Sequence, residues 1–215
     1  MAITLPHAAM SQLFDAPASN DLPPVPNYNV CPTTQVHTVT SEDRARRLRP
    51  MRWGFIPHWY DKPSAGPLLI NARAETIAAK PAFREACRAR RCLVIADGFY
   101  EWARTPGETP LPWWITRRDG APMALGAVWQ AWERNGTSLT TCAVVTTGAN
   151  ADMAAIHDRL PVIIETADQA LWLGEEGHGA ANLMRPIADG ALTFQRVSTA
   201  VNSSRASGPD LIAAI

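Results

Sequence analysis

The chain has 215 residues, a length that suits one generous domain or two small ones with a real hydrophobic core. Hydrophobic residues make up 47% and charged residues 19%, which indicates a soluble globular protein. The formal net charge is zero, which argues against a strongly basic nucleic-acid binder but not against a local basic groove. No stretch approaches the roughly 18 apolar residues of a membrane span, and no secretion signal is recognisable, so we expect a cytoplasmic protein.

The N-terminal part predicts short elements joined by proline-rich loops. Residues 7–14 have helical spacing, residues 17–26 have loop composition, and residues 36–40 are a strand candidate. The run 42–52 is the densest in positive charge. It is interpreted as a solvated hairpin or loop, with a phosphate-facing patch as the alternative. Its arginines are Arg44, Arg46, Arg47, Arg49 and Arg52.

Residues 51–60 hold several aromatic side chains between glycine and proline. Trp53 and Phe55 alternate like strand residues and are expected in the core. Trp59 and Tyr60 are adjacent, so they cannot both face one core from an extended strand, and we expect at least one to be exposed. Exposed aromatics of this kind can stack on a nucleobase, although aromatics in such loops are also often core plugs.

Three later segments carry polar residues at the ends of apolar runs. An apolar strand is expected to end at Asn71, with Arg73 on the same face. The run 92–96 predicts a buried strand that turns at residues 97–98 and returns with Glu101 among three aromatics. His157 follows a short helical piece. Glu101 and His157 would make an acid/base pair, whereas the alternatives are a carboxylate pointing to water and a structural histidine.

The remaining elements alternate between strands and a few helices. Residues 80–90 and 166–173 predict helices, residues 104–112 a hairpin loop, and residues 135–136 (Asn-Gly) a hairpin turn. Strands are expected at 113–116, 124–131, 138–147, 162–164 and 192–197. This pattern favours one α+β domain over residues 1–215, with a curled, barrel-like, mostly antiparallel sheet and peripheral helices.

The four cysteines are irregularly spaced and form no CxxC pair. We interpret Cys31, Cys87, Cys92 and Cys142 as small buried hydrophobes in a reducing compartment. The sequence holds no metal-ligand spacing and no GxSxG nucleophile motif, so we expect no metal and no cofactor.

Six ordered blocks of the chain resemble the SOS response-associated peptidase family, also called abasic-site processing proteins. The blocks are YNVCPT (28–33), RWGFIPHWYDKP (52–63), LINARAET (69–76), ADGFYEW (96–102), IHDRLPVII (156–164) and VSTAVN (197–202). The resemblance implies a monomeric DNA-repair enzyme of the DNA-damage response that binds single-stranded DNA. It would attach covalently to abasic sites through its N-terminal residue, with lyase and autoproteolytic peptidase (hydrolase) activities.

The resemblance also implies roles for particular residues. His157 would assist sugar ring opening, Glu101 would shuttle protons, and Asn71 would orient the N-terminal residue and the sugar. The expected DNA contacts are Asn29, Arg73, Thr146 and Arg159 at phosphates or in ordering the site, and Trp59 with Tyr60 as a wedge at a single-strand/duplex junction.

The N-terminus departs from the family, which begins Met-Cys-Gly-Arg-Phe and uses that cysteine's amine and thiol to form a thiazolidine. This chain begins Met1-Ala2-Ile3. Either its start is wrong or truncated, which the retained Glu101 and His157 favour, or it is a variant without the nucleophile. No cysteine is near the N-terminus in sequence, so we expect at most a reversible Schiff base or nicking of abasic DNA as a lyase, and no stable crosslink. The alternative functions are a non-catalytic single-stranded DNA-binding protein and a peptidase acting on other proteins.

Overall fold

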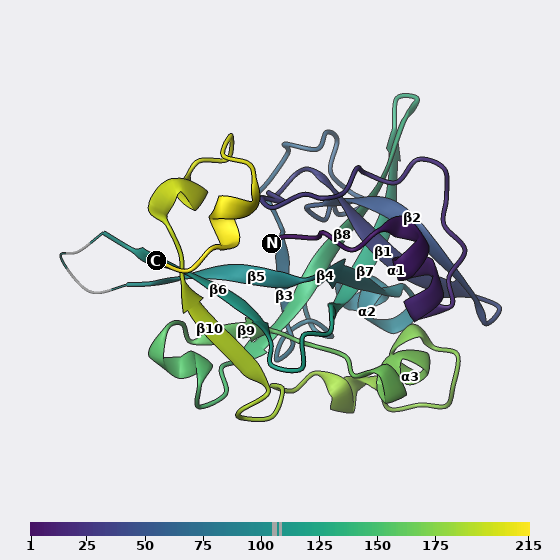
Figure 1. The fold of residues 1–215 in the computed structure, drawn as a ribbon. Coiled ribbons are helices and arrows are strands. Elements are labelled where there is room, and N and C mark those ends of the chain that lie inside the picture. Colours follow the sequence, from purple (N-terminus) through teal and green to yellow (C-terminus); the bar gives the residue numbers. More distant parts are fainter. Residues whose placement is uncertain (105–106, 108) are drawn as a thin grey trace.

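A ring of five strands forms the centre of the computed structural model, which describes residues 1–104, 107 and 109–215. The strands are β1 (Gln35–Glu42), β2 (Ala45–Trp53), β4 (Arg91–Ala96), β7 (Met123–Arg134) and β8 (Thr137–Gly148). Neighbours in the order β2-β1-β4-β7-β8 are antiparallel, and a parallel pairing of β2 with β8 closes the ring (Figure 1). The expected curled, mostly antiparallel sheet is therefore confirmed as a closed barrel.

Two tight turns determine the long hairpins of this barrel. Asp43 and Arg44 join β1 to β2 with φ angles of 50° and 64°, and Asn135 and Gly136 join β7 to β8 with φ angles of 50° and 76°. Two consecutive residues with positive φ match the twist of the flanking strands. The arginine-rich run thus forms a hairpin strand, as its first interpretation predicted.

Two short strands pair with the end of β8, one on each edge, because Thr146 pairs with both of them. The strand β3 (Asn71–Arg73) runs parallel to β8, with Asn71 opposite Val144 and Arg73 opposite Thr146. The strand β9 (Arg159–Pro161) is antiparallel to β8. The predicted strands at 68–71 and 162–164 are therefore misplaced: the first begins at Asn71 instead of ending there, and the second lies earlier. Both shifts bring polar residues from distant segments to one end of β8.

A second sheet packs beside the barrel in the order β10-β6-β5. It consists of β5 (Gly98–Ala103), β6 (Leu111–Arg117) and β10 (Leu192–Arg196). Gly98 allows β5 to approach β6 closely, because a Cβ there would lie 2.3 Å from the Ile115 carbonyl oxygen. The predicted hairpin loop at 104–112 joins β5 to β6, and its residues 105–106 and 108 lie outside the described residues.

The hydrophobic core has two parts. The larger fills the barrel with side chains such as Val39, Leu93 and Leu125, all fully buried. The smaller lies against the second sheet, where Tyr100 and Trp114 stack with ring centroids 4.8 Å apart. Burial of such side chains is the main stabilising term, at about 25 cal/mol per Å² of apolar surface. The two cores meet along β5, the strand that carries Glu101.

Helices lie at the periphery, as expected. They are α1 (His7–Phe14), α2 (Arg84–Ala89) and α3 (Gln169–Leu173), with 3₁₀ turns at Met153–Ala155, Thr166–Asp168, Ala180–Leu183, Thr199–Asn202 and Pro209–Ile212. The predicted helix at 80–90 is shorter than expected. Among the described residues, no helix is long and apolar enough to span a membrane.

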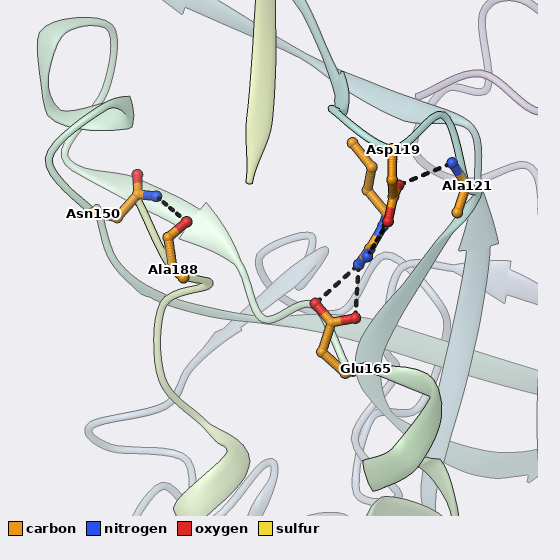
Figure 2. Close-up of polar contacts among 6 residues, drawn as sticks. Asp119, Ala121, Asn150, Glu165 and Ala188 are labelled. Atoms are coloured by element: carbon orange, nitrogen blue, oxygen red, sulfur yellow. Dashed lines mark hydrogen bonds and ion pairs between the residues drawn. The ribbon is translucent and has the colours of Figure 1, made fainter. Parts of the chain in front are cut away.

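Polar contacts tie the chain after β9 back onto the sheets (Figure 2). Arg117 on β6 forms ion pairs with Asp119 at 2.6 Å and with Glu165 at 3.0 Å. Asn150 donates its side-chain amide to the Ala188 carbonyl at 3.4 Å. These contacts hold the segment that follows β9 against β6 and against the residues that precede β9.

Candidate functional site

A cavity of about 660 Å³ opens where the barrel, the second sheet and the C-terminal segment meet. Its lining includes seven of the nine predicted site residues: Asn29, Asn71, Arg73, Glu101, Thr146, His157 and Arg159. Met1, Cys31, Tyr100, Trp102 and Asn202 line it as well. The volume falls within the usual range for ligand-binding sites. The structure thus brings together residues that are up to 130 positions apart in sequence, counted from Asn29 to Arg159.

The N-terminal segment is held in place by β5 and the turn before it. Ala2 donates its N–H to the Gly98 carbonyl at 3.2 Å and accepts a hydrogen bond from the Asp97 N–H at 2.9 Å. Thr4 donates to the Asp97 carboxylate. Figure 1 shows the N-terminus in the middle of the view, next to β5. These bonds direct Met1 into the cavity, while Ala2 itself is fully buried.

The α-amine of Met1 is enclosed, although the residue as a whole is half-buried. It donates to the Val30 carbonyl at 3.2 Å, and the Val30 N–H returns a bond to the Met1 carbonyl at 2.8 Å. Desolvation lowers the pKa of this amine from 8.0 to about 5, against smaller opposing effects of Cys31 and Glu101. The amine is therefore mostly neutral at pH 7, which leaves its lone pair available for attack on a carbonyl.

Glu101 lies on β5 within the cavity lining and is half-buried. Desolvation raises the pKa of its carboxyl group, while His157, the Trp102 backbone and the N-terminal amine oppose that rise. The effects of His157 and of the amine indicate that both lie close enough to interact with Glu101 electrostatically. A carboxyl group with a raised pKa beside a neutral amine is suited to take up and release a proton during a reaction.

His157 has a defined ring orientation. Its Nδ1 atom accepts the Arg159 N–H at 3.0 Å, and a backbone N–H can only donate. Nδ1 also lies 3.2 Å from the Arg159 carbonyl oxygen, which accepts from the other tautomer, so the Arg159 backbone engages this ring atom in either case. The Asp158 carboxylate lies 3.4 Å from the same atom. Nε2 is thus the ring atom suited to exchange a proton with a bound molecule.

Arg159 is anchored by an acidic partner and by β8. Its guanidinium donates to both carboxylate oxygens of Glu75, at 2.8 and 2.9 Å, and to the Thr146 carbonyl at 2.7 Å. The guanidinium lowers the pKa of Glu75 to about 2. Thr146 adds a hydroxyl contact at 3.3 Å. This network fixes the guanidinium at the cavity wall with its charge balanced by Glu75, which is consistent with the predicted role of these residues in ordering the site.

Arg73 and Asn71 contrast with Arg159. They occupy the same face of β3, as predicted, and both are exposed. Among the described residues, neither side chain makes a hydrogen bond or an ion pair. An arginine in this state keeps its donors for a phosphate.

Asn29, by contrast, is already engaged. Its amide nitrogen donates to the carbonyls of Ser203 and Ala206, both at 3.0 Å, and its side-chain oxygen accepts from the Cys31 thiol at 3.5 Å. The Asn29 amide could donate to a phosphate only after giving up its bonds to Ser203 and Ala206. The geometry suits a residue that orders the cavity wall.

Trp59 and Tyr60 lie outside the cavity lining in the described structure. The Trp59 side chain is 45% exposed and Tyr60 is half-buried, which confirms that at least one is exposed. Their loop is fastened to β7, because Trp132 donates to the Tyr60 carbonyl at 2.8 Å. The wedge role remains a prediction.

The sequence interpretation missed Cys31. It was expected to be a buried hydrophobe, and no cysteine was expected near the N-terminus. Cys31 is instead half-buried and lines the cavity beside Met1, because Val30 pairs with Met1 across the chain. Cys87 is also half-buried, whereas Cys92 and Cys142 are buried as predicted. Sequence spacing does not reveal a pairing between residues 1 and 30.

The primary amines of the chain are few. Among the described residues, no group of three or more His, Cys, Asp or Glu suited to a metal ion occurs. The sequence has only two lysines, Lys62 and Lys80, and neither lines the cavity. The primary amine in the cavity is therefore the α-amine, which stands beside an acid/base pair.

Comparison with known proteins places this geometry in context. The family described as SOS response associated peptidase (SRAP) matches residues 1–204. The Abasic site processing protein YoqW of Bacillus subtilis is 35% identical over 191 residues, which cover 87% of this chain and 85% of that protein. The Abasic site processing protein YedK of Escherichia coli is 31% identical over 196 residues, covering 89% and 86%.

Solved structures share the fold. A protein from Bordetella bronchiseptica superposes with a TM-score of 0.78 at 23% identity, covering 92% of this chain and 98% of that one. A protein from Bacteroides thetaiotaomicron gives a TM-score of 0.76 at 24% identity, covering 85% and 82%. The barrel with its adjoining sheet is therefore a recurrent architecture.

Proposed function

Because this chain belongs to the SOS response associated peptidase family, we propose that it processes abasic sites in DNA, as the names of its relatives state for them. An abasic site carries an aldehyde in its ring-opened form. The single observation that carries the proposal is the neutral, enclosed α-amine of Met1 in a cavity that Glu101 and His157 also line.

The proposed reaction is imine formation at the sugar C1′ carbon. The neutral amine adds to the aldehyde, a C–N bond forms, and the carbonyl oxygen leaves as water. Lysine amines have a pKa near 10.4 and are almost fully protonated at neutral pH, so a desolvated α-amine has the advantage. Holding the aldehyde beside it would raise the rate further by removing the entropy cost of encounter.

Glu101 and His157 would divide the proton transfers. Glu101, with its raised pKa, would accept the proton released by the attacking amine and return it to the departing hydroxyl. His157, with Nε2 available, would donate to the ring oxygen of the closed sugar and so promote opening to the aldehyde. Asn71, which lines the cavity, would orient the sugar hydroxyls.

The substrate would be single-stranded DNA. Arg73 offers a side chain with its donors available to a phosphate, and Arg159, held by Glu75 and Thr146, would order the wall nearby. Trp59 is presented from a fastened loop, where it could stack on a base at a single-strand/duplex junction, with Tyr60 beside it at a centroid distance of 6.3 Å. We propose that the protein acts as a monomer.

The same groups support two further activities. An imine at C1′ acidifies the neighbouring C2′ hydrogens, and removal of one by Glu101 would expel the 3′ phosphate, which is a lyase reaction. The acid/base pair could also assist hydrolytic release of an N-terminal residue, which would account for the peptidase in the family description.

Incubation with an abasic single-stranded oligonucleotide tests the proposal. Borohydride reduces an imine to a stable amine, so a denaturing gel should show a conjugate of protein and DNA when the reductant is present. An intact oligonucleotide without an abasic site is the control. Binding without any trapped conjugate would instead favour a non-catalytic single-stranded DNA-binding protein.

A further inference from the structure

The cavity holds a thiol as well as an amine, and we propose that Cys31 is the second nucleophile of this site. Its sulfur would add to the imine carbon and convert a reversible adduct into a persistent one. This inference rests on the proposed imine chemistry and extends it to a residue that sequence spacing excluded.

The backbone places the two nucleophiles side by side. Met1 donates to the Val30 carbonyl at 3.2 Å, and that carbonyl carbon is bonded directly to the Cys31 nitrogen. The Val30 N–H completes a two-way bridge to Met1 at 2.8 Å. Cys31 is thus the residue that directly follows the hydrogen-bond acceptor of the Met1 amine. Met1 and Cys31 both line the same cavity.

The thiol is oriented by Asn29. The Cys31 Sγ atom donates to the Asn29 carbonyl at 3.4 Å and lies 3.5 Å from its side-chain oxygen. Asn29 is itself held by Ser203 and Ala206. The side chain of Cys31 is half-buried and lines the cavity, so a bound aldehyde could reach it.

The amine is a second, independent feature of the same wall. It is an enclosed ionisable group whose one hydrogen-bond partner among the described residues is the Val30 carbonyl. Met1 itself lines the cavity. Cys31 and Glu101 both act on the amine electrostatically, and each raises its pKa, which agrees with their closeness.

The other cysteines do not share this setting. Burial raises the pKa of Cys92 and of Cys142, the latter to about 12. Cys87 lies on α2, outside the cavity lining, and burial raises its pKa as well. Cys87 therefore serves as a matched control, because it is half-buried like Cys31 but lies elsewhere.

The step balances without an oxidant or a reductant. Sulfur forms a bond to the imine carbon, and the π electrons of the C=N bond move to nitrogen. The thiol proton passes to that nitrogen, with Glu101 placed to relay it. The product is an N,S-acetal that links the DNA to both Met1 and Cys31. Counted from the aldehyde, the only molecule released is the water lost on imine formation.

Such an adduct should persist because hydrolysis now requires two steps. The carbon–sulfur bond must break before water can reach a C=N bond. The folded chain holds the released thiol beside the carbon, so re-addition would compete with hydrolysis at a high effective concentration.

The experiment measures the ratio of conjugate formed without reductant to conjugate trapped with borohydride, on abasic single-stranded DNA. The 215-residue chain is compared with Cys31→Ala and Cys87→Ala. We expect the ratio to fall about tenfold or more in Cys31→Ala and to stay at the wild-type value in Cys87→Ala. An unchanged ratio in Cys31→Ala overturns the inference.

A second measurement uses the wild-type protein alone and does not depend on the folding of a variant. The reductant-free conjugate is treated with iodoacetamide after denaturation, digested and mapped by mass. We expect Cys31 to be protected from alkylation and joined through the sugar to the N-terminal peptide. An alkylated Cys31 in the conjugate contradicts the inference while leaving imine formation intact. Failure of borohydride to trap any conjugate would instead reject the proposed function itself.

Discussion

Thr4 donates two hydrogen bonds to a single carboxylate oxygen of Asp97, from its backbone N–H at 2.6 Å and from its hydroxyl at 2.7 Å. The two residues are 93 positions apart. Asp97 sits at the turn between β4 and β5, so its carboxylate fastens the N-terminal segment to the strand that carries Glu101. This contact helps to hold the segment that carries the amine against β5, although neither residue lines the cavity.

Removal of this contact should impair both stability and chemistry. Hydrogen bonds to charged groups contribute about 1.5–3 kcal/mol each, so Asp97→Ala should lower the free energy of unfolding by that order. We expect the rate of borohydride-trapped conjugate formation to fall as well, since the amine loses its anchor. Urea denaturation and single-turnover trapping measure the two effects. Asp97→Asn retains an acceptor and should fall between Asp97→Ala and wild type, and an Asp97→Ala protein with wild-type trapping would refute this positioning role.

Glu101→Gln should separate catalysis from stability. The substitution keeps the shape of the side chain and removes the desolvated carboxyl group, so the melting temperature should stay equal or rise. Loss of general acid/base assistance typically costs about 10²–10⁴-fold in rate, which is the expected fall in imine formation. Glu133→Gln, on the exposed end of β7, is the matched control and should trap at the wild-type rate. Equal rates for both variants would remove Glu101 from the mechanism.

The low pKa of the Met1 amine predicts an unusual pH profile. The folded amine has a pKa of about 5, and its ordinary value is 8.0. Imine formation limited by this amine should therefore rise with a midpoint near pH 5 and level off by pH 7. Between pH 5 and pH 8 the amine binds a proton in the unfolded chain but not in the folded one. This group therefore makes the free energy of unfolding rise with pH over that range. Rates of trapping from pH 4.5 to 8.5 check the midpoint, and a midpoint near 8 would show that the amine is solvated.

Arg73→Ala should weaken DNA binding in a salt-dependent manner. An arginine that neutralises one phosphate contributes a slope of about −0.7 to the logarithmic salt dependence on single strands, and this contribution should disappear. Fluorescence anisotropy with an unmodified single strand at several salt concentrations measures the slope. Arg84→Ala is the control, because Arg84 lies on α2 and pairs at the surface with Glu85. A slope that matches wild type in Arg73→Ala would place Arg73 away from the phosphates.

Local patterns were sufficient for much of the fold. The Asn135-Gly136 turn, the alternation of β5 and the apolar run of β4 each have a local cause, and the structure contains them as predicted. Helix ends and the short strands β3 and β9 were placed less well. Both strands exist because β8 offers its edge for pairing, and a three-residue sequence carries no such information.

The site residues also divide into those with a local sequence signal and those whose position depends on distant parts of the chain. Glu101 and Asn71 could be recognised because polar residues at the ends of apolar runs are conspicuous, and the family resemblance supplied their expected roles. Cys31 could not, because its closeness to Met1 depends on the pairing of Met1 with Val30. The engagement of Asn29 by Ser203 and Ala206 is equally invisible in the sequence, since the partners are main-chain atoms more than 170 positions away.

Identification of the amine that carries the DNA tests the central claim most directly. The chain has three primary amines, the α-amine and the side chains of Lys62 and Lys80, and the cavity lining includes only the first. Peptide mapping by mass spectrometry of the borohydride-reduced conjugate should locate the sugar on the nitrogen of the N-terminal residue. A conjugate mapped to Lys62 or Lys80 would contradict the account.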